Sequence, residues 1–440
     1  MIHKNRKKTS PWWQLGLVAG AIAIVGLCWL LTHFRGSSES RTVSMPDSHL
    51  GDTGKPRQAQ PAAAAARAPR SVPSGIESEG SAVSAEAFRE APRAEATPGT
   101  RELVAGVTTL DLSDDGALTQ EAANAWNAGF GQLVQAGAAA LPAIREYLEA
   151  FKDVSFGTSG LQRLGHASAR GALFDALTRI GGPEAVALTL DILESTAEPA
   201  EIALLAGNLE MLAPDESQWR EEVTAAARQA LEQAAGGSPG EQDVAPLFEV
   251  LNRFGGAAVV PDLEEASTNW NYYAAMALAE LPESAGVPSL VQMAQEKKGI
   301  IPLQMLAQLA PENPDARAAL LEQAQSNEIP ASAWPYLQSV LEGKRFHFAD
   351  SVFDASGDTA SLNGLNIVHI AHGNQNYYMA TDATRLSPEH IDQQIALVNE
   401  LVAVAQGPAA VQTLKNTQAA LAEALAAAEE AHGLTSVTPQ

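Results

Sequence analysis

Cysteine is almost absent from this sequence of 440 residues, in which Cys28 is the only one. A single thiol excludes a disulfide framework within the chain and a zinc site built from several cysteines. Cys28 lies inside an apolar run, so we exclude it as an enzymatic nucleophile and expect it to behave as a small hydrophobic residue. A lipoprotein cysteine is excluded as well, because Leu27 stands where a small residue should precede it.

Basic and aromatic residues are also scarce, since Lys and Arg number 28 against 52 Asp and Glu and aromatic residues make up 5% of the chain. Residues 1–100 hold 12 basic and 8 acidic residues, which leaves 16 basic and 44 acidic residues for 101–440. A region that acidic is a poor partner for nucleic-acid phosphates and is repelled by anionic lipid surfaces. We therefore expect a solvated acidic surface and no nucleic-acid partner.

Common catalytic and phosphate-binding motifs are missing too. The sequence contains no H-E-x-x-H, no G-x-S-x-G, no G-x-G-x-x-G and no G-x-x-x-x-G-K-[ST]. These patterns carry metal hydrolysis, acyl transfer, dinucleotide binding and nucleotide phosphate binding, respectively. We therefore assign no catalytic, cofactor-binding or metal-binding residue, expect no cofactor, and do not predict an enzyme.

What the chain does have at its start is an apolar segment behind a basic tail. Residues 1–11 carry four basic side chains, and no charged side chain follows from Trp12 to Phe34. A helix of this length spans about 34 Å, enough for the ~30 Å hydrocarbon layer of a membrane. We predict a retained signal-anchor helix over 12–34. A cleaved signal peptide is the alternative, but the apolar run is long and the bulky Thr32–Arg35 offers no small-residue cleavage site.

The flanking charges predict which side of the membrane the rest of the chain occupies. The four basic residues before the segment outnumber Arg35 and Arg41 after it, which favours a cytoplasmic N-terminus. No asparagine begins an N-x-Ser/Thr sequon, and the exported part has no cysteine, whereas proteins of the eukaryotic secretory pathway usually carry one or the other. We therefore expect a single-pass protein of a bacterial inner membrane with a periplasmic C-terminal domain.

A stem rich in small and polar residues follows the anchor. Residues 36–100 contain 13 Ala, 10 Ser and 7 Pro, and Phe88 is their only aromatic residue. Such a composition cannot bury enough apolar surface to offset the loss of chain entropy. We predict a disordered tether over residues 35–116.

From Leu118 onward the pattern becomes helical and repetitive. Apolar residues recur at i, i+3, i+4 and i+7, and glycine or proline interrupts them. The breaks fall at Gly181-Gly182, Pro214, Gly255-Gly256, Pro282 and 311–314. The last leucine before each break recurs about every 32 residues, a period typical of α-solenoids with two helices per repeat.

The segment ASARGALFDALTRIGGPEAVALTLDIL at Ala167–Leu193 resembles a HEAT-type (armadillo-like) repeat. The resemblance extends over about Leu118–Leu341 and implies an all-α fold, an irregular HEAT-like α-solenoid of about six helical hairpins over 117–342. It also implies protein-binding scaffolding rather than catalysis. The spacing is irregular, and Lys152–Gly165 is predicted to be a loop inserted between two copies. Trp126, Trp219, Trp270 and Trp334 fall in or beside the helices, where we expect them to pack between helices.

Residues 343–386 interrupt the helical pattern. The stretches 366–371 (NIVHIA) and 376–381 (NYYMAT), with a turn between them, predict a β-hairpin. A C-terminal helical hairpin and tail should then cover 387–440, starting at the N-cap Ser387 before Pro388. Aromatic residues of the insert are candidate partner-binding residues, because rigidly held rings often anchor interfaces. They are Phe346, Phe348, Phe353, Tyr377 and Tyr378. The alternative, left open here, is that these rings pack under the terminal helices and close the solenoid.

A second function is considered for the same region. His347, His369, His372 and His390 lie close in sequence to Asp350, Asp354 and Asp358. Imidazole and carboxylate groups together could hold a divalent metal, which would make residues 343–390 a metal-binding module or a metal-assisted hydrolase. Strand geometry argues against it, because residues three apart, such as His369 and His372, point to opposite faces of a strand. The preferred prediction is a membrane-anchored periplasmic scaffold that binds other envelope proteins through an acidic solenoid.

Overall fold

The computed structural model describes residues 94–110, 118–215, 217–237, 242–349, 368–372, 375–381 and 387–435. The predicted tail, the anchor Trp12–Phe34 and residues 35–93 of the predicted stem lie outside these ranges. Within them, no helix is both long enough and apolar enough to cross a membrane.

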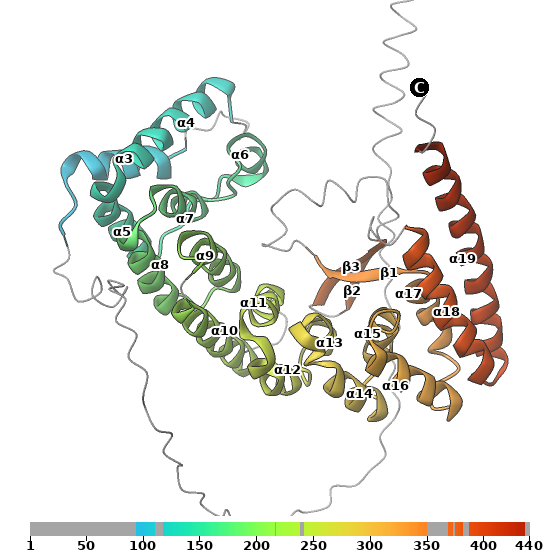
Figure 1. Cartoon of the computed structure of the whole chain (residues 1–440). Coiled ribbons are helices and arrows are strands. Elements are labelled where there is room, and N and C mark those ends of the chain that lie inside the picture. The colour runs from blue at the N-terminus through green and yellow to red at the C-terminus, as the bar shows by residue number, and fades with distance from the viewer. Residues whose placement is uncertain are drawn as a thin grey trace, which may run out of the picture.

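The described chain is mostly helical, as predicted, and successive helices alternate between two rows that curve into an arc (Figure 1). Helices of one row pack on the next members of the same row, so that α7, α9, α11, α13, α15 and α17 are consecutive neighbours on the concave side. The convex side carries α5, α8, α10, α12, α14 and α16. This arrangement fits an α-solenoid-like fold.

The bounds of the paired helices follow the predicted breaks. They are α4 (Gln120–Gln135) and α5 (Leu141–Glu149), α7 (Ala169–Ile180) and α8 (Pro183–Ser195), α9 (Pro199–Leu212) and α10 (Gln218–Gly236), α11 (Ala245–Gly255) and α12 (Val260–Ala266), α13 (Asn271–Glu280) and α14 (Val287–Gln295), and α15 (Ile301–Leu309) and α16 (Pro314–Gln325). Each predicted glycine or proline break lies between a concave helix and the convex helix that follows it. Gly181 and Gly182, for example, have φ angles of +68° and +84°, a conformation that favours glycine, and Pro183 then begins α8.

Two stretches predicted to lack regular structure are helical. The predicted stem already contains α3 (Pro98–Thr108), which Thr97 caps and whose Val104 and Val107 are buried against the array. The prediction of disorder over residues 35–116 is therefore wrong for Pro98–Thr108. The predicted inserted loop at Lys152–Gly165 is also wrong in part, because α6 (Gly157–Leu164) forms there between the buried Phe156 and Leu164.

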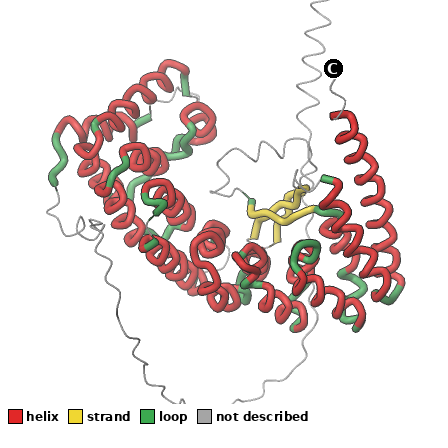
Figure 2. The backbone as a smooth tube through the Cα atoms, in the orientation of Figure 1, coloured by secondary structure: helices red, strands yellow, loops and turns green. Residues whose placement is uncertain are grey.

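The predicted insert contains a three-stranded antiparallel sheet with the strand order β1-β3-β2. Its strands are β1 (Lys344–Phe348), β2 (Val368–His372) and β3 (Gln375–Thr381). The predicted β-hairpin is confirmed as β2 and β3, whereas β1 was not predicted. In register, Phe348 and Ile370 flank Tyr377 on opposite sides. The sheet lies on the concave side of the arc, between α11 and α17 (Trp334–Leu341) (Figure 2).

The chain closes the array with the predicted helix pair. Ser387 caps α18 (Pro388–Val404) by accepting a hydrogen bond from the His390 backbone N–H, and α19 (Pro408–Thr435) packs on α18 and α17. The predicted packing role of the tryptophans is confirmed, because all of them inside the array are buried. They are Trp126, Trp219, Trp270 and Trp334.

Candidate interaction surface

The sheet does not present its aromatic residues to solvent as predicted. Phe346, Phe348 and Tyr377 have exposed fractions of 1%, 5% and 0%. Tyr378 is half-buried and stacks on His347, with ring centroids 5.7 Å apart, while Phe353 lies outside the described residues. The prediction that these rings anchor a partner is therefore wrong for Phe346, Phe348 and Tyr377, since a buried ring offers no contact area.

The buried rings attach the sheet to α13. Tyr377 stacks on Tyr272 with ring centroids 5.2 Å apart, and Phe348 lies 5.6 Å from the ring of Tyr273. Phe346 in turn meets Tyr377 edge to face at 5.6 Å. Such aromatic pairs contribute beyond the area that they bury. These rings are core residues, as the alternative interpretation held. They pack against α13, however, and not under the terminal helices.

Buried polar groups fix the position of the same sheet. The side-chain oxygen of Gln375 accepts hydrogen bonds from the backbone N–H groups of Tyr272 and Tyr273, at 2.9 and 3.2 Å, and so satisfies two donors in the first turn of α13. The side-chain oxygen of Gln308 on α15 accepts the N–H of Phe346 at 2.9 Å. Burial raises the pKa of the Tyr273 and Tyr377 hydroxyls well above the usual range. The sheet is thus an integral part of the fold.

The histidines proposed as metal ligands are spread over this region. His347 on β1 and His369 on β2 flank Tyr378 in register, whereas His372 lies at the end of β2 and pairs with Gln375. The His390 Nδ1 atom lies 2.6 Å from Ser387 Oγ at the start of α18. Asp350, Asp354 and Asp358 are outside the described residues. Within the part of the chain that the structure describes, no three His, Cys, Asp or Glu side chains come together as a metal site.

Three exposed apolar side chains follow α5: two lie on the connection to α6 and the third lies on α6 itself. Phe151, Val154 and Leu161 are 64%, 41% and 54% exposed, although Val and Leu are usually buried in globular proteins. We call these three side chains the α5–α6 surface. Residues 149–155 are all exposed, so Phe151 and Val154 are both accessible from solvent. Exposed apolar residues in close succession are typical of interaction sites.

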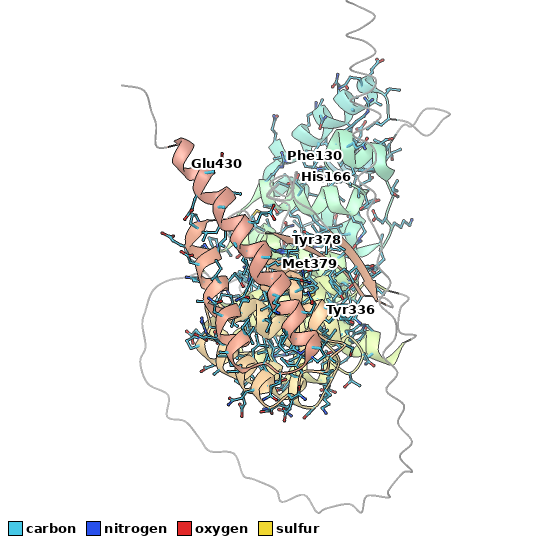
Figure 3. The ribbon with its side chains drawn as sticks, turned by 90° about the vertical axis from the view of Figure 1, so that its right-hand side faces the viewer. Phe130, His166, Tyr336, Tyr378, Met379 and Glu430 are labelled. Atoms are coloured by element: carbon cyan, nitrogen blue, oxygen red, sulfur yellow. The ribbon has the colours of Figure 1, made fainter. Side chains whose placement is uncertain are left out.

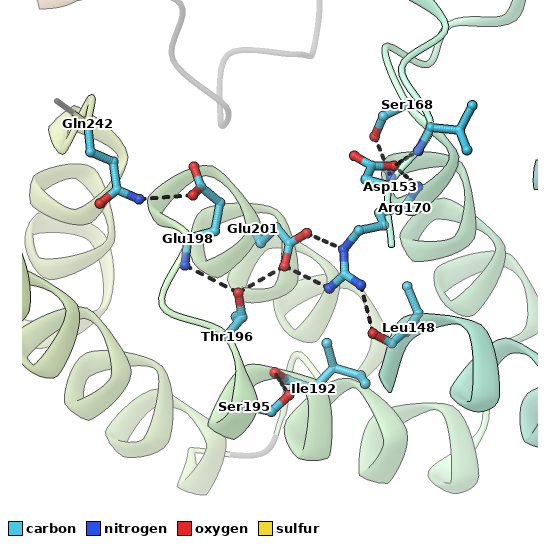
Figure 4. A network of polar contacts seen from close by, with 12 residues as sticks. Leu148, Asp153, Ser168, Arg170, Ile192, Ser195, Thr196, Glu198, Glu201 and Gln242 are labelled. Carbon is cyan, nitrogen blue, oxygen red and sulfur yellow. Dashed lines mark hydrogen bonds and ion pairs between the residues drawn. The ribbon is translucent and has the colours of Figure 1, made fainter. Parts of the chain in front are cut away.

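Hydrogen bonds hold the backbone of this surface against the start of α7 (Figure 4). One carboxylate oxygen of Asp153 accepts the N–H groups of Val154 and Arg170, at 2.8 and 3.0 Å. The Val154 carbonyl accepts the N–H of Ala169 at 2.9 Å. The Arg170 guanidinium also donates to the Leu148 carbonyl at 2.7 Å. A connection held at both ends in this way presents its side chains from a fixed support.

Phe151 occupies an unusual backbone conformation at the centre of this surface. Its φ angle of +51° is left-handed, a region that costs a bulky L-residue about 1–2 kcal/mol relative to the right-handed helix. Its ring is nevertheless mostly exposed, with the centroid 6.0 Å from the guanidinium carbon of Arg170. The same left-handed conformation follows α14 at Lys297 and α16 at Asn327, so at Phe151 it reflects the end of α5. Phe151 is the leading candidate contact residue because its ring is the most exposed of the three side chains.

An aromatic cluster supports the far side of α6. The His166 ring lies 5.6 Å from Trp126 and 5.7 Å from Phe130, and Phe130 and His166 are side by side in Figure 3. The His166 Nε2 atom is 3.4 Å from an oxygen of Asp175, which also pairs with Arg179. Burial raises the pKa of the Asp175 carboxyl, but the hydrogen bonds from His166 and Arg179 outweigh burial and lower it overall. The cluster joins α4, the α6–α7 link and α7 into one support.

The α5–α6 surface was missed because the segment was predicted to be an inserted loop. Its signal in the sequence is weak: apolar residues alternate with charged ones, as in Phe151-Lys152-Asp153-Val154, without helical or strand periodicity. In the structure, Phe156 and Leu164 are the buried apolar residues of this segment, whereas Phe151, Val154 and Leu161 stay exposed. The sequence alone does not distinguish these two groups. Comparison with known proteins adds no assignment, because no protein-family model, curated protein or solved structure matches this chain.

Proposed function

We propose that this protein is a membrane-anchored periplasmic scaffold that binds other envelope proteins through a HEAT-like α-solenoid. The observation that carries the proposal is the α5–α6 surface, where Phe151 and Val154 are exposed on a connection fixed by hydrogen bonds and Leu161 is exposed on α6. Exposed aromatic and aliphatic groups on a rigid support are the usual anchors of protein interfaces.

The HEAT-like assignment rests on the repeat of the array. Two alternating rows of helices, of which the concave helices α7 to α17 each contact the next in the row, form an extended surface. The Gly-Gly-Pro turn between α7 and α8 lies at the position where the resemblance places the turn of a repeat. Such arrays serve binding rather than catalysis, because their curvature offers long surfaces to a partner.

The membrane assignment rests on the sequence before the described residues. Trp12–Phe34 has the length and the lack of charge of a spanning helix, and basic residues precede it. Residues 35–93 would place the body about 40 Å from the membrane surface, if they behave as the flexible chain that their composition predicts. A scaffold on a tether of that reach can meet membrane-bound and free partners alike.

Site-specific photo-crosslinking tests the proposed surface. A photoreactive amino acid replaces Phe151 in the full chain, expressed in a bacterial inner membrane, and a matched variant carries it at Tyr336, an exposed position on α17. We expect a discrete adduct with an envelope protein from position 151 only, and loss of this adduct when Leu161→Ser is added. No adduct from position 151, or the same adducts from both positions, contradicts the proposal.

Fusion reporters test the proposed location independently. A C-terminal alkaline phosphatase, which is active only outside the cytoplasm, should be active, and a C-terminal fluorescent protein that matures only in the cytoplasm should be dark. The mature chain should also keep Trp12–Phe34 attached. The opposite reporter pattern, or an N-terminus near Gly36, contradicts the anchored periplasmic topology without bearing on the interaction surface.

A further inference from the structure

Arg170 contacts the connection between α5 and α6 at several points. Its guanidinium donates to the Leu148 carbonyl at 2.7 Å, and the backbone N–H of Phe151 donates to the same oxygen at 3.2 Å. The backbone N–H of Arg170 donates to the Asp153 carboxylate, which also accepts the N–H of Val154. The guanidinium carbon lies 6.0 Å from the Phe151 ring centroid. One residue of α7 therefore contacts both ends of the stretch that carries the exposed Phe151 and Val154.

The Arg170 guanidinium is in turn held by α9. Both oxygens of the Glu201 carboxylate accept its N–H groups, and the Thr196 hydroxyl donates to one of these oxygens at 2.9 Å (Figure 4). A guanidinium is planar and carries its donors in a fixed fork. A carboxylate that binds one edge of this fork at two points therefore also sets the direction of the N–H group that reaches Leu148.

We infer that Glu201 is a positioning residue of the α5–α6 surface and that it acts on this surface through Arg170. The groups that donate to its carboxylate belong to Arg170 and Thr196, and neither residue is part of the connection at 149–155. The inference rests on the proposed function, and it goes beyond that proposal because it places part of the support of the surface in the next pair of helices. A contact residue that is held before binding loses less conformational entropy when the partner binds.

Lysine at position 170 separates this role from general stabilisation. Its ammonium keeps a positive charge beside the Glu201 carboxylate. It is a compact point charge, however, and does not hold both carboxylate oxygens and the Leu148 carbonyl in the fixed arrangement of a guanidinium. We therefore expect Arg170→Lys to loosen the connection while α7 and α9 stay folded.

Hydrogen–deuterium exchange of the full chain measures this loosening without a partner. In Arg170→Lys the Phe151 amide should exchange at least tenfold faster, because the end of α5 that accepts it is less firmly held. Glu201→Gln should have the same effect, since an amide offers the guanidinium one acceptor oxygen in place of two. The amides of residues 172–177 in α7 are the internal reference, and their exchange should stay as in the wild type.

A matched control changes a similar ion pair at another place on α9. Arg253 of α11 pairs with Glu210 near the end of α9, away from the connection. Arg253→Lys should therefore leave the exchange of the Phe151 amide unchanged.

Partner crosslinking gives the second readout. With a photoreactive amino acid at Val154, we expect the adduct to fall at least threefold in Arg170→Lys and in Glu201→Gln, and to stay unchanged in Arg253→Lys. The double variant of Arg170 and Glu201 should lose little more than the more affected single variant, because both changes act on the same contact.

The inference and the proposed function can fail separately. If the wild-type chain gives no adduct from position 154, the proposed function is wrong for this surface, and exchange at Phe151 still decides whether Glu201 positions it. Unchanged exchange at Phe151 in Glu201→Gln overturns the inference. Equal acceleration at Phe151 and in the α7 reference overturns it as well, because the ion pair would then only stabilise the fold. Additive losses of the adduct in the double variant would show that Glu201 does not act through Arg170.

Discussion

Arg170 on α7 and Glu201 on α9 form an ion pair between neighbouring helices of the concave row. The Arg170 side chain is 5% exposed and that of Glu201 is 16% exposed, and both oxygens of the carboxylate accept N–H groups of the guanidinium. Other arginines link neighbouring parts of the array in the same manner. These pairs are Arg101 with Glu146, Arg145 with Asp191, Arg228 with Asp262, Arg253 with Glu210, and Arg317 with Glu400. Six of the 16 basic residues after residue 100 thus link neighbouring helices.

The buried pair should be essential for stability. Arg170→Met removes the cation from a largely buried Glu201 carboxylate, which keeps only the Thr196 hydroxyl as a donor, and it removes one donor of the Leu148 carbonyl. We expect a loss of about 3 kcal/mol in unfolding free energy. Urea unfolding of the full chain, followed by circular dichroism, measures it. Arg101→Met is the matched control: its pair with Glu146 is about half exposed, so the unfolding midpoint should not move measurably. Equal effects of the two changes would mean that burial does not decide the contribution of these pairs.

The order of helices and turns could be predicted from the sequence because local signals determine them. Glycine and proline interrupt the apolar period at each turn between a concave and a convex helix, from Gly181-Gly182 to Pro314. The N-cap Ser387 likewise marks the start of α18. The helix α3 was missed because alanine and proline dominate its surroundings, although Val104 and Val107 already show helical spacing.

The position of the sheet could not be predicted, because it depends on contacts between residues far apart in the chain. Gln375 meets the backbone of Tyr272 across 103 residues, and no local pattern encodes that pairing. A partial signal was present in α13, whose residues from Tyr272 to Ala279 are all buried. A helix that is apolar on every side must be covered on every side. A helix of this kind in the concave row therefore indicates that another element covers its concave side. In this structure that element is the sheet that carries Tyr377.

Tyr377 should behave as a core residue and not as a binding residue. Tyr377→Ala removes a fully buried ring that contacts Tyr272 and Phe346, and we expect a loss of about 3–5 kcal/mol in unfolding free energy, as for other large-to-small core changes. Tyr378→Ala, its half-buried neighbour on the other face of β3, should cost about 1 kcal/mol. Thermal and urea unfolding distinguish the two. A stable Tyr377→Ala variant would show that the sheet contributes little to the fold.

The buried tyrosines also predict a loss of stability at alkaline pH. Burial raises the folded-state pKa of Tyr273 and Tyr377, while an unfolded tyrosine ionises near pH 10. Above that pH the unfolded chain binds fewer protons than the folded chain, so unfolding free energy is full below about pH 10 and falls by up to about 1.4 kcal/mol per pH unit for each tyrosine. Urea unfolding between pH 8 and 11 measures the slope. Tyr377→Phe should reduce the slope, and Tyr336→Phe on the surface of α17 should leave it in place. An unchanged slope in Tyr377→Phe would contradict the assignment.

The contribution of Phe151 to partner binding should be separable from its contribution to stability. Phe151→Gly relieves the left-handed backbone at φ +51°, which glycine adopts freely, and it removes a ring that is 64% exposed. We expect unfolding free energy to stay constant or to rise by up to about 1 kcal/mol, because backbone relief offsets the lost contact with Arg170 and the added entropy of the unfolded chain. Partner crosslinking at Val154 should fall at least fivefold in the same variant. Ala150→Gly is the matched control, since Ala150 has a right-handed φ of −73°, and this change should lower stability without affecting the adduct. A Phe151→Gly variant that is destabilised by several kcal/mol would show that the ring is structural, and one that keeps the adduct would move the contact away from Phe151.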